Sequence, residues 1–424
     1  MQDAPRPGAW ITLAVLFVVY TLNFLDRSLV YILFKPIRAE MALSELQLAL
    51  LGSTAFVLFY TVLGLPFGRL ADRTRRTALI AAGLAVWSIA SSCTGLATSF
   101  AGLLLCRVMV GVGEASLGPA AYSLLADWFP PSRRATAAAL FSAGIPLGAG
   151  LATGLGGVLA ETVGWRMAFP VLGLPGLLVA AVVLALPEPA RGASDAHLPP
   201  DGSSLGSVLR GSSVPWLHVS GYATLAVAAN AWGMWVPTWL AGRFDRSLAE
   251  VGVAVGACTV IGGLLGTTLG GAAADALQRR FAGGRLLFGA ATALGSAAVW
   301  ATLIGTTSWP VALLSCGLGL MLGLAWLGPA SADVQDLVPP VHRGLAISGY
   351  YLVVNVVGYG LGAPLIGALA DRAGGATDPE RMAQVLLVCP AACCVAAAIL
   401  LAGAMARASA EDRPLVSAGT KARA

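Results

Sequence analysis

The sequence predicts an all-α membrane protein in which twelve transmembrane helices form two related bundles of six. Three observations support this: an apolar composition, twelve apolar runs long enough to cross a bilayer, and motifs that recur between the halves. Of 424 residues, 57% are hydrophobic and 11% are charged, whereas soluble domains have about 25% charged residues. This composition excludes an ordinary soluble domain.

The apolar runs give the expected positions of the helices, because a crossing needs roughly 20 predominantly apolar residues. They lie near residues 9–34, 47–70, 77–98, 100–127, 134–160, 165–187, 215–242, 247–274, 285–307, 309–333, 343–370 and 381–406. The predicted domains are an N-terminal six-helix bundle (1–187), a cytoplasmic linker rich in Pro, Ser and Gly (188–214), a C-terminal six-helix bundle (215–407) and a cytoplasmic tail (408–424).

Lysine and arginine predict the orientation in the membrane. They are concentrated at the helix ends and in the segments on the side of the two chain termini, and cytoplasmic loops carry such an excess. We therefore expect both termini to be cytoplasmic, in the inner or plasma membrane of the cell. The same distribution accounts for the net charge of +5 without a nucleic-acid partner.

Three short motifs recur in the same order in the two halves. The pairs are Gly68-Arg-Leu-Ala-Asp72 with Gly271-Ala-Ala-Ala-Asp275, Leu117-Gly-Pro-Ala120 with Leu327-Gly-Pro-Ala330, and Gly157-Val-Leu-Ala-Glu161 with Gly367-Ala-Leu-Ala-Asp371. Many transporter folds are built from such repeats, with the cargo site between them. The recurrence therefore favours a transporter.

Four charged residues fall inside apolar runs: Asp26, Arg27, Arg107 and Glu114. Charged side chains at membrane depth are costly and usually mark a pathway or a partner. Asp26 is expected roughly 13 Å, and Arg107 roughly 11 Å, below the same outer edge at 1.5 Å per residue. Glu114 follows Arg107 by two turns on nearly the same helix face. Arg107 is therefore placed to pair alternately with the two acids.

This arrangement suggests proton coupling, because a change of ionic partner changes the proton affinity of a carboxyl group. The hypothesis is that Asp26 and Glu114 titrate and that Arg107 is the switchable counter-charge. The alternative is a static buried network that fixes the run 9–34 against the run 100–127. Arg27, turned about 100° from Asp26 around the helix, is then a packing or headgroup-side charge.

The run 215–242 carries an aromatic stripe of Trp232, Trp235 and Trp239, with Asn230 on the same helix. Such a stripe forms one face and could line a cavity that holds an acyl chain. The alternative is a lipid-facing interfacial belt. Charge on one wall and aromatics on the other would suit an amphiphilic cargo. The candidate cargo contacts are Asn23, Arg27, Arg107, Asn230, Trp232, Trp235 and Trp239.

Proline and glycine punctuate several of the expected helices. The prolines that interrupt long runs are Pro119, Pro146, Pro237, Pro329 and Pro364. In membranes such residues permit bending and close helix approach. Tight packing is their default interpretation.

Two longer motifs resemble a known family. Gly68-Arg-Leu-Ala-Asp72-Arg73-Thr-Arg75-Arg76 resembles the signature loop of the major facilitator superfamily, and Arg107-Val-Met-Val-Gly111-Val-Gly113-Glu114-Ala115 resembles its helix 4 motif. The resemblance implies the major facilitator fold. It also implies a gating latch at Gly68, Asp72, Arg73, Arg76 and Asp275 that stabilises the outward-open state. Arg75 replaces a common Gly, and the second copy lacks the Arg after Asp275.

More narrowly, the first half resembles the spinster branch, whose members transport sphingolipids and lysophospholipids. The residues that carry this resemblance are Asn23-Phe-Leu-Asp26-Arg27, Gly-Val-Gly-Glu-Ala-Ser ending at Ser116, Ala126-Asp127-Trp-Phe129 and Ile145-Pro146-Leu-Gly148.

We therefore expect a monomeric, proton-coupled secondary transporter that moves a lysophospholipid or sphingolipid-like amphiphile by alternating access, surrounded by membrane lipids. A proton-linked exporter of hydrophobic drugs and a non-transporting membrane sensor are the alternatives. An enzyme is not expected, because HExxH, GxSxG and Gly-Lys-Ser/Thr motifs are missing. No cofactor or metal is expected, since the proton gradient supplies the energy, and the seven cysteines lie in apolar runs.

Overall fold

The computed structural model describes residues 5–190, 212–338, 343–375 and 378–411. Every regular element in these ranges is helical. The first half contains α1 (Ala9–Ile32), α2 (Phe34–Met41), α3 (Glu45–Ala49), the π-helix η1 (Leu50–Thr54), α4 (Ala55–Arg73), α5 (Arg76–Thr94), α6 (Phe100–Glu114), α7 (Leu117–Trp128), α8 (Pro131–Ser142), α9 (Gly144–Thr162), α10 (Trp165–Gly173) and α11 (Pro175–Ala185).

The second half contains α13 (Val214–Arg243), α14 (Leu248–Gln278), α15 (Gly284–Gly305), α16 (Trp309–Ala325), α17 (Leu327–Asp336), α18 (Arg343–Val353), the π-helix η3 (Val354–Tyr359), α19 (Gly360–Ala373), α20 (Pro379–Leu386) and α21 (Val388–Glu411). The predicted tail begins inside α21, which continues to Glu411. Most of the predicted linker (191–211) and the rest of the tail (412–424) lie outside the described residues.

Eleven stretches of the described residues are long and apolar enough to cross a membrane. The remaining predicted helix is α13, which has 30 residues but also His218, Asn230 and two prolines, which lower its mean hydropathy. It packs against α21, η3 and α19 within the bundle. The predicted all-α membrane fold is confirmed.

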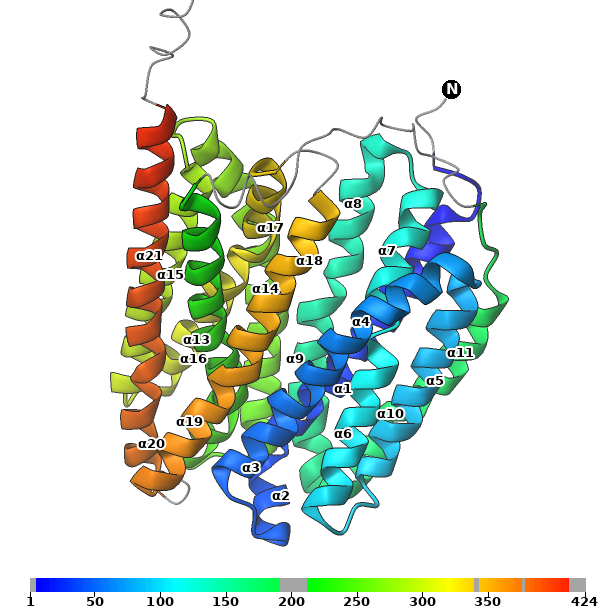
Figure 1. The fold of residues 1–424 in the computed structure, drawn as a ribbon. Coiled ribbons are helices and arrows are strands. Elements are labelled where there is room, and N and C mark those ends of the chain that lie inside the picture. The colour runs from blue at the N-terminus through cyan, green and yellow to red at the C-terminus, as the bar shows by residue number, and fades with distance from the viewer. Residues whose placement is uncertain (1–4, 191–211, 339–342, 376–377, 412–424) are drawn as a thin grey trace, which may run out of the picture.

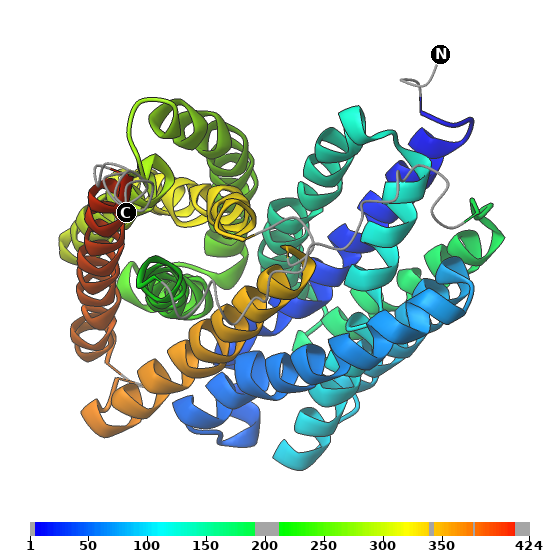
Figure 2. The ribbon, with the colours of Figure 1, turned by 45° about the horizontal axis from the view of Figure 1, so that its top comes forward.

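The two halves lie side by side, with their helices running in broadly the same direction (Figure 1). The start of α1 and the end of α21 lie on one side of the molecule, hereafter the termini side. The short helices α2, α3 and α20 lie on the other side, hereafter the opposite side. In the tilted view of Figure 2 the first half occupies one side of the picture and the second half the other.

Several predicted helices are split into two because of proline. α6 ends before Ala115, α8 ends before Ala143, and α16 ends before Trp326. Each interruption falls three or four residues before a proline, namely Pro119, Pro146 and Pro329. Proline provides no N–H for the carbonyl one turn earlier, and its ring crowds that carbonyl.

Glycines bring α9 and α14 into direct backbone contact between the halves. A Cβ atom on Gly150 would lie 2.6 Å from the carbonyl oxygen of Gly256, and one on Gly252 would lie 2.6 Å from that of Thr153. Any larger residue would force the two helices apart, as in other membrane helix pairs that meet through small residues. We call this contact the α9–α14 seam.

Gly252→Ala should lower the melting temperature of the detergent-solubilised protein, because the added methyl group has no space beside the Thr153 carbonyl. Overpacking of this kind costs about 1–3 kcal/mol. Gly271→Ala in the same helix is the control, since a Cβ there meets no atom within 4 Å. Equal melting temperatures for the two variants would contradict the tight seam.

Candidate functional site

The structure brings the four charged residues of α1 and α6 together inside the first half. Asp26 and Arg107 are each 1% exposed and Glu114 is fully buried. The Arg27 side chain retains 20% of its exposure. Arg27 is thus the member of this charge cluster that is most open to a ligand.

The ionic partners differ from those expected. Arg27 Nη2 lies 2.9 Å from Glu114 Oε2, whereas Arg107 donates to the backbone carbonyls of Leu51 at 3.3 Å, Asp26 at 3.1 Å and Arg27 at 3.1 Å. A guanidinium has five N–H donors, and backbone oxygens supply several acceptors for Arg107. In this conformation Arg27, not Arg107, pairs with an acid.

Aromatic rings surround the guanidinium of Arg27. Its Cζ lies 4.6 Å from the ring centre of Phe24, 4.3 Å from that of Phe56 and 4.9 Å from that of Tyr60. The negative faces of aromatic rings attract cations. Arg27 therefore belongs to the charge cluster and packs among aromatic rings, which agrees with the packing alternative for this residue. Its long side chain overcomes the 100° turn from Asp26.

The Asp26 carboxylate accepts a hydrogen bond from Ser91 Oγ at 2.6 Å. Among the described residues it forms no salt bridge. Asn23, one turn earlier on α1, is also buried and contacts Glu114. Sequence reasoning missed Ser91, because a serine within an apolar run carries no distinguishing signal.

The aromatic stripe of α13 is buried rather than open to lipid. Trp232 is 2% exposed and stacks on Trp300 with ring centres 4.6 Å apart, so it packs within the second half. This contradicts both the cavity-wall and the interfacial-belt interpretations for Trp232. A helical face derived from spacing does not reveal which neighbour covers it.

The other two tryptophans line a cavity of about 300 Å³ on the opposite side. Trp235 lies 5.3 Å from the ring of Phe34 in the first half, and Trp239 Nε1 donates to the Pro379 carbonyl at 2.9 Å. Asn230 is 3.4 Å from Ser53 of the first half. These α13 residues therefore lie near the junction of the halves.

On the opposite side, two repeated acids join the halves. The Asp371 carboxylate accepts from the N–H groups of Glu45 at 2.8 Å and Leu46 at 2.9 Å. The corresponding acid of the first half, Glu161, accepts from the N–H of Ala249 at 3.1 Å. Each acid thus binds the first turn of a helix in the other half, where exposed N–H groups and the helix dipole favour a negative charge.

On the termini side the predicted gating residues are not together. Asp72 and Arg73 are exposed, and Asp72 forms no salt bridge within the part of the chain that the structure describes. Gly68 lies near Pro119, because a Cβ atom added to Gly68 would lie 3.9 Å from Pro119 Cβ. Asp275 pairs with Arg285 at 2.9 Å. In this conformation, and among the described residues, these side chains do not form the latch that the resemblance implies.

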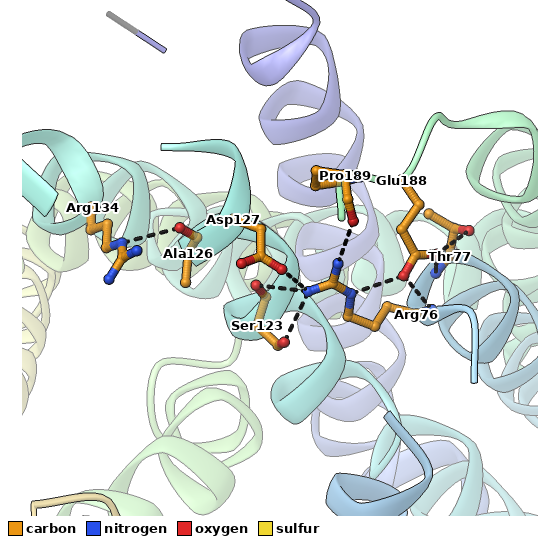
Figure 3. A network of polar contacts seen from close by, with 8 residues as sticks. All are labelled: Arg76, Thr77, Ser123, Ala126, Asp127, Arg134, Glu188 and Pro189. Carbon is orange, nitrogen blue, oxygen red and sulfur yellow. Dashed lines mark hydrogen bonds and ion pairs between the residues drawn. The ribbon is translucent and has the colours of Figure 1, made fainter. Parts of the chain in front are cut away.

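Arg76 is fully buried and belongs to a polar network of the first half (Figure 3). Its guanidinium forms ion pairs with Asp127 and, at 2.9 Å, with Glu188. It also donates to the carbonyls of Ser123 and Pro189, both at 3.1 Å. Arg76 therefore fixes the start of the linker to the first half.

The pKa of Glu188 reflects this network. Burial alone would raise it, but hydrogen bonds from the backbone and guanidinium of Arg76 and from Thr77 lower it below the usual value for glutamate. A carboxyl group with a lowered pKa stabilises the fold above its unfolded pKa, and this contribution disappears as the pH falls through the lowered value. The linker attachment should therefore weaken in acid.

The second half contains a buried polar cluster that the sequence analysis did not anticipate. Asp333 of α17 is fully buried and pairs with Arg407 of α21 at 2.7 Å. His218 Nε2 of α13 lies 3.7 Å from the same carboxylate. The cluster joins three helices of one half. No sequence motif indicates this cluster, because only the fold brings His218 near an acid.

Two related helical halves with charged groups buried between their helices define a secondary transporter. The chain belongs to the major facilitator superfamily, whose family model matches residues 16–362. The family and fold are those of integral membrane transporters, not of enzymes.

Similarity to individual proteins is extensive. The chain is 31% identical to an MFS-type efflux pump of Mycolicibacterium smegmatis, over 92% of this chain and 91% of the pump. It is 29% identical to spinster homolog 3 of Danio rerio (90% and 82% covered) and 26% identical to a probable sphingolipid transporter, spinster homolog 2, of Arabidopsis thaliana (79% and 72% covered).

A solved structure shows the same fold. It is a bacterial homolog of the human lysosomal transporter spinster, in an inward-facing and occupied conformation, with a TM-score of 0.83 and 26% identity over 95% of this chain and 98% of that one. Together with the spinster relatives, this places the chain in the spinster branch, as the sequence motifs predicted.

Arg76→Leu should lower stability by about 3–5 kcal/mol, because it removes one partner of a buried ion pair and leaves the Asp127 carboxylate without this guanidinium. Thermal unfolding in detergent would measure the loss. Arg73→Leu, at an exposed position, is the control. If the Arg76→Leu variant were as stable as the control, the network would not contribute to the stability of the fold.

Proposed function

We propose that this protein is a proton-coupled secondary active transporter that moves an amphiphilic lipid, of the lysophospholipid or sphingolipid type, by alternating access. The observation that carries the proposal is the charge cluster of Asp26, Arg27, Arg107 and Glu114. It holds two carboxyl groups in the membrane interior and one partly exposed cation, Arg27.

In this proposal Arg27 is the counter-charge that changes partner. Neutralisation of Glu114 by a proton removes the attraction that now holds Arg27, and the guanidinium becomes available to an anionic group of the cargo. Asp26, whose carboxylate accepts from the Ser91 hydroxyl and forms no salt bridge among the described residues, is the second proton acceptor. Arg107 holds α6 against α1 through the backbone carbonyls of Asp26 and Arg27.

Two hydroxyl pairs support an amphiphilic cargo. Tyr122 of the first half lies 3.3 Å from Ser142, and Tyr351 of the second half lies 2.7 Å from Ser331. Tyr122 is 46% exposed and Tyr351 is 42% exposed. Exposed hydroxyl groups on both halves can bind a polar head, while apolar side chains receive the tail.

The named relatives leave two cargo classes. The Arabidopsis relative is named a probable sphingolipid transporter, which supports a lipid. The mycobacterial relative is named an efflux pump, and its sequence identity of 31% exceeds the 26% of the Arabidopsis relative. A drug exporter is therefore the second candidate. Both candidates share the proposed proton gradient, cytoplasmic termini, monomeric state and location in the cell membrane, and neither requires a cofactor.

Proteoliposomes containing the purified protein should accumulate or release a fluorescent lysophospholipid faster when a pH gradient is imposed. Asp26→Asn should abolish the dependence on the gradient, because the amide cannot bind the coupling proton. Glu250→Gln, an exposed acid of α14, is the control. Lipid movement that remains gradient-dependent in Asp26→Asn would contradict proton coupling through Asp26, and transport of a cationic drug but no lipid would favour the second candidate.

Asp371→Ala and Asp72→Ala should change the conformational equilibrium in opposite directions. Loss of the Asp371 hydrogen bonds to α3 favours separation of the halves on the opposite side. Loss of Asp72, the proposed latch of the outward-open state, favours the inward-open state. Distances between spin labels on the two halves would measure both shifts, and a shift in the same direction for both variants would refute this assignment.

A further inference from the structure

Within the described residues each half contains one π-helical segment, and the two segments meet. η1 interrupts the helix that continues as α4, and η3 precedes α19. The segments contact each other across the halves. π-helical turns are rare and frequently mark functional sites, because the wider turn displaces backbone groups from their usual hydrogen bonds.

In the second half, Pro364 leaves a backbone carbonyl that η1 can bind. It lies inside α19 and has no N–H to donate to the carbonyl of Gly360, one turn earlier. The Thr54 hydroxyl donates to that carbonyl at 2.9 Å, and the hydroxyl of buried Ser53 donates to the carbonyl of Tyr359. Two side chains of η1 thus satisfy backbone acceptors of the other half.

Two carbonyl groups of η1 accept hydrogen bonds from side chains at the charge cluster. Arg107 Nε donates to the Leu51 carbonyl at 3.3 Å, and the Tyr31 hydroxyl donates to the Gly52 carbonyl at 3.2 Å. One five-residue segment therefore binds Arg107 through its backbone and the other half through its side chains.

Gly52 of η1 is closely packed by neighbouring side chains. A Cβ atom on Gly52 would lie 2.8 Å from Met234 Cε in the second half, and 2.9 Å from Phe34 Cζ. The backbone of η1 at Gly52 therefore lies close to side chains of both halves.

We propose that η1 is a coupling segment, which transmits changes in the charge cluster to the contact between the halves, and that Ser53 and Thr54 are its positioning residues. When Arg107 changes its hold on the Leu51 carbonyl, the segment rotates, and the two hydroxyl groups leave or regain their acceptors on η3 and α19. The inference rests on the proposed alternating-access function and extends it to residues that touch neither proton nor cargo.

The charged and titratable groups around the segment define what it can respond to. Arg107 is faced by Asp26, Arg27 and Tyr31 of α1 and by Glu114 of its own helix. On the side of the other half, Ser53 also lies near Asn230. Protonation of the cluster therefore acts on η1 through Arg107 and Tyr31, whereas the contacts of Ser53 and Thr54 with η3 and α19 are neutral.

The test uses the full-length protein in lipid nanodiscs, with spin labels at exposed Ala39 of α2 and exposed Thr307 between α15 and α16. Distance distributions are recorded at about pH 7.5 and about pH 5.5, a range in which perturbed carboxyl groups titrate. Thr54→Val keeps the side-chain shape but removes the hydroxyl donor, and Ser53→Ala does the same for the second contact. Thr292→Val is the control, because that buried hydroxyl bonds within its own helix at 2.9 Å.

We expect the double variant Ser53→Ala/Thr54→Val to raise, by about tenfold, the population in which the halves are separated on the opposite side. This is the effect of losing one or two hydrogen bonds. Its response to pH should fall to less than half that of the wild type, while Thr292→Val keeps the wild-type response. A double variant with wild-type populations and pH response would overturn the coupling role. A wild type that ignores pH would instead refute the proposed proton coupling, and the population shift would still decide the role of the junction.

Discussion

The cost of an unpaired polar group in a membrane interior determines much of this structure. In hydrocarbon, each backbone or charged group without a partner is unfavourable by several kcal/mol, so Arg107 cannot simply occupy a helix interface. It binds three backbone carbonyls, and one of them lies in a π-helical segment. That hydrogen bond links the guanidinium directly to the segment that contacts the other half.

The same constraint recurs wherever the halves meet. Asp371 and Glu161 bind backbone N–H groups at the starts of helices in the opposite half. Thr54 donates to the Gly360 carbonyl, to which Pro364 has no N–H to donate. These contacts use backbone groups of one half and side chains of the other, whereas the α9–α14 seam brings backbone directly against backbone. The halves are therefore held by specific polar contacts together with glycine packing.

Sequence reasoning predicted the fold well because hydrophobic length and repetition are properties of the chain alone. The prolines that split α6 from α7 and α16 from α17 were visible for the same reason. The charge cluster was also predicted, since four charged residues inside apolar runs are conspicuous. Its pairing was not: Arg107 was expected to bind the acids, but backbone carbonyls, which no sequence pattern displays, proved to be its partners.

Other parts of the site depend on contacts between distant segments. Ser53, Thr54 and Ser91 are ordinary residues in apolar runs, and only the approach of another helix gives them a role. Trp232 shows the converse, because its helical spacing was correct but the face was covered by Trp300. Asp333 and Arg407 are far apart in the sequence, and only the fold brings them together with His218 in a buried cluster.

The missing amide hydrogen of Pro364 has a kinetic consequence. If the halves separate on the opposite side, as the proposed alternating access requires, the Gly360 carbonyl loses the Thr54 hydroxyl, and Pro364 has no N–H to replace that bond. An unsatisfied buried acceptor costs about 1–3 kcal/mol, which slows a crossing by roughly 5- to 150-fold if it is paid at the barrier. A single imino acid thereby lengthens the lifetime of the closed arrangement without adding any contact to it.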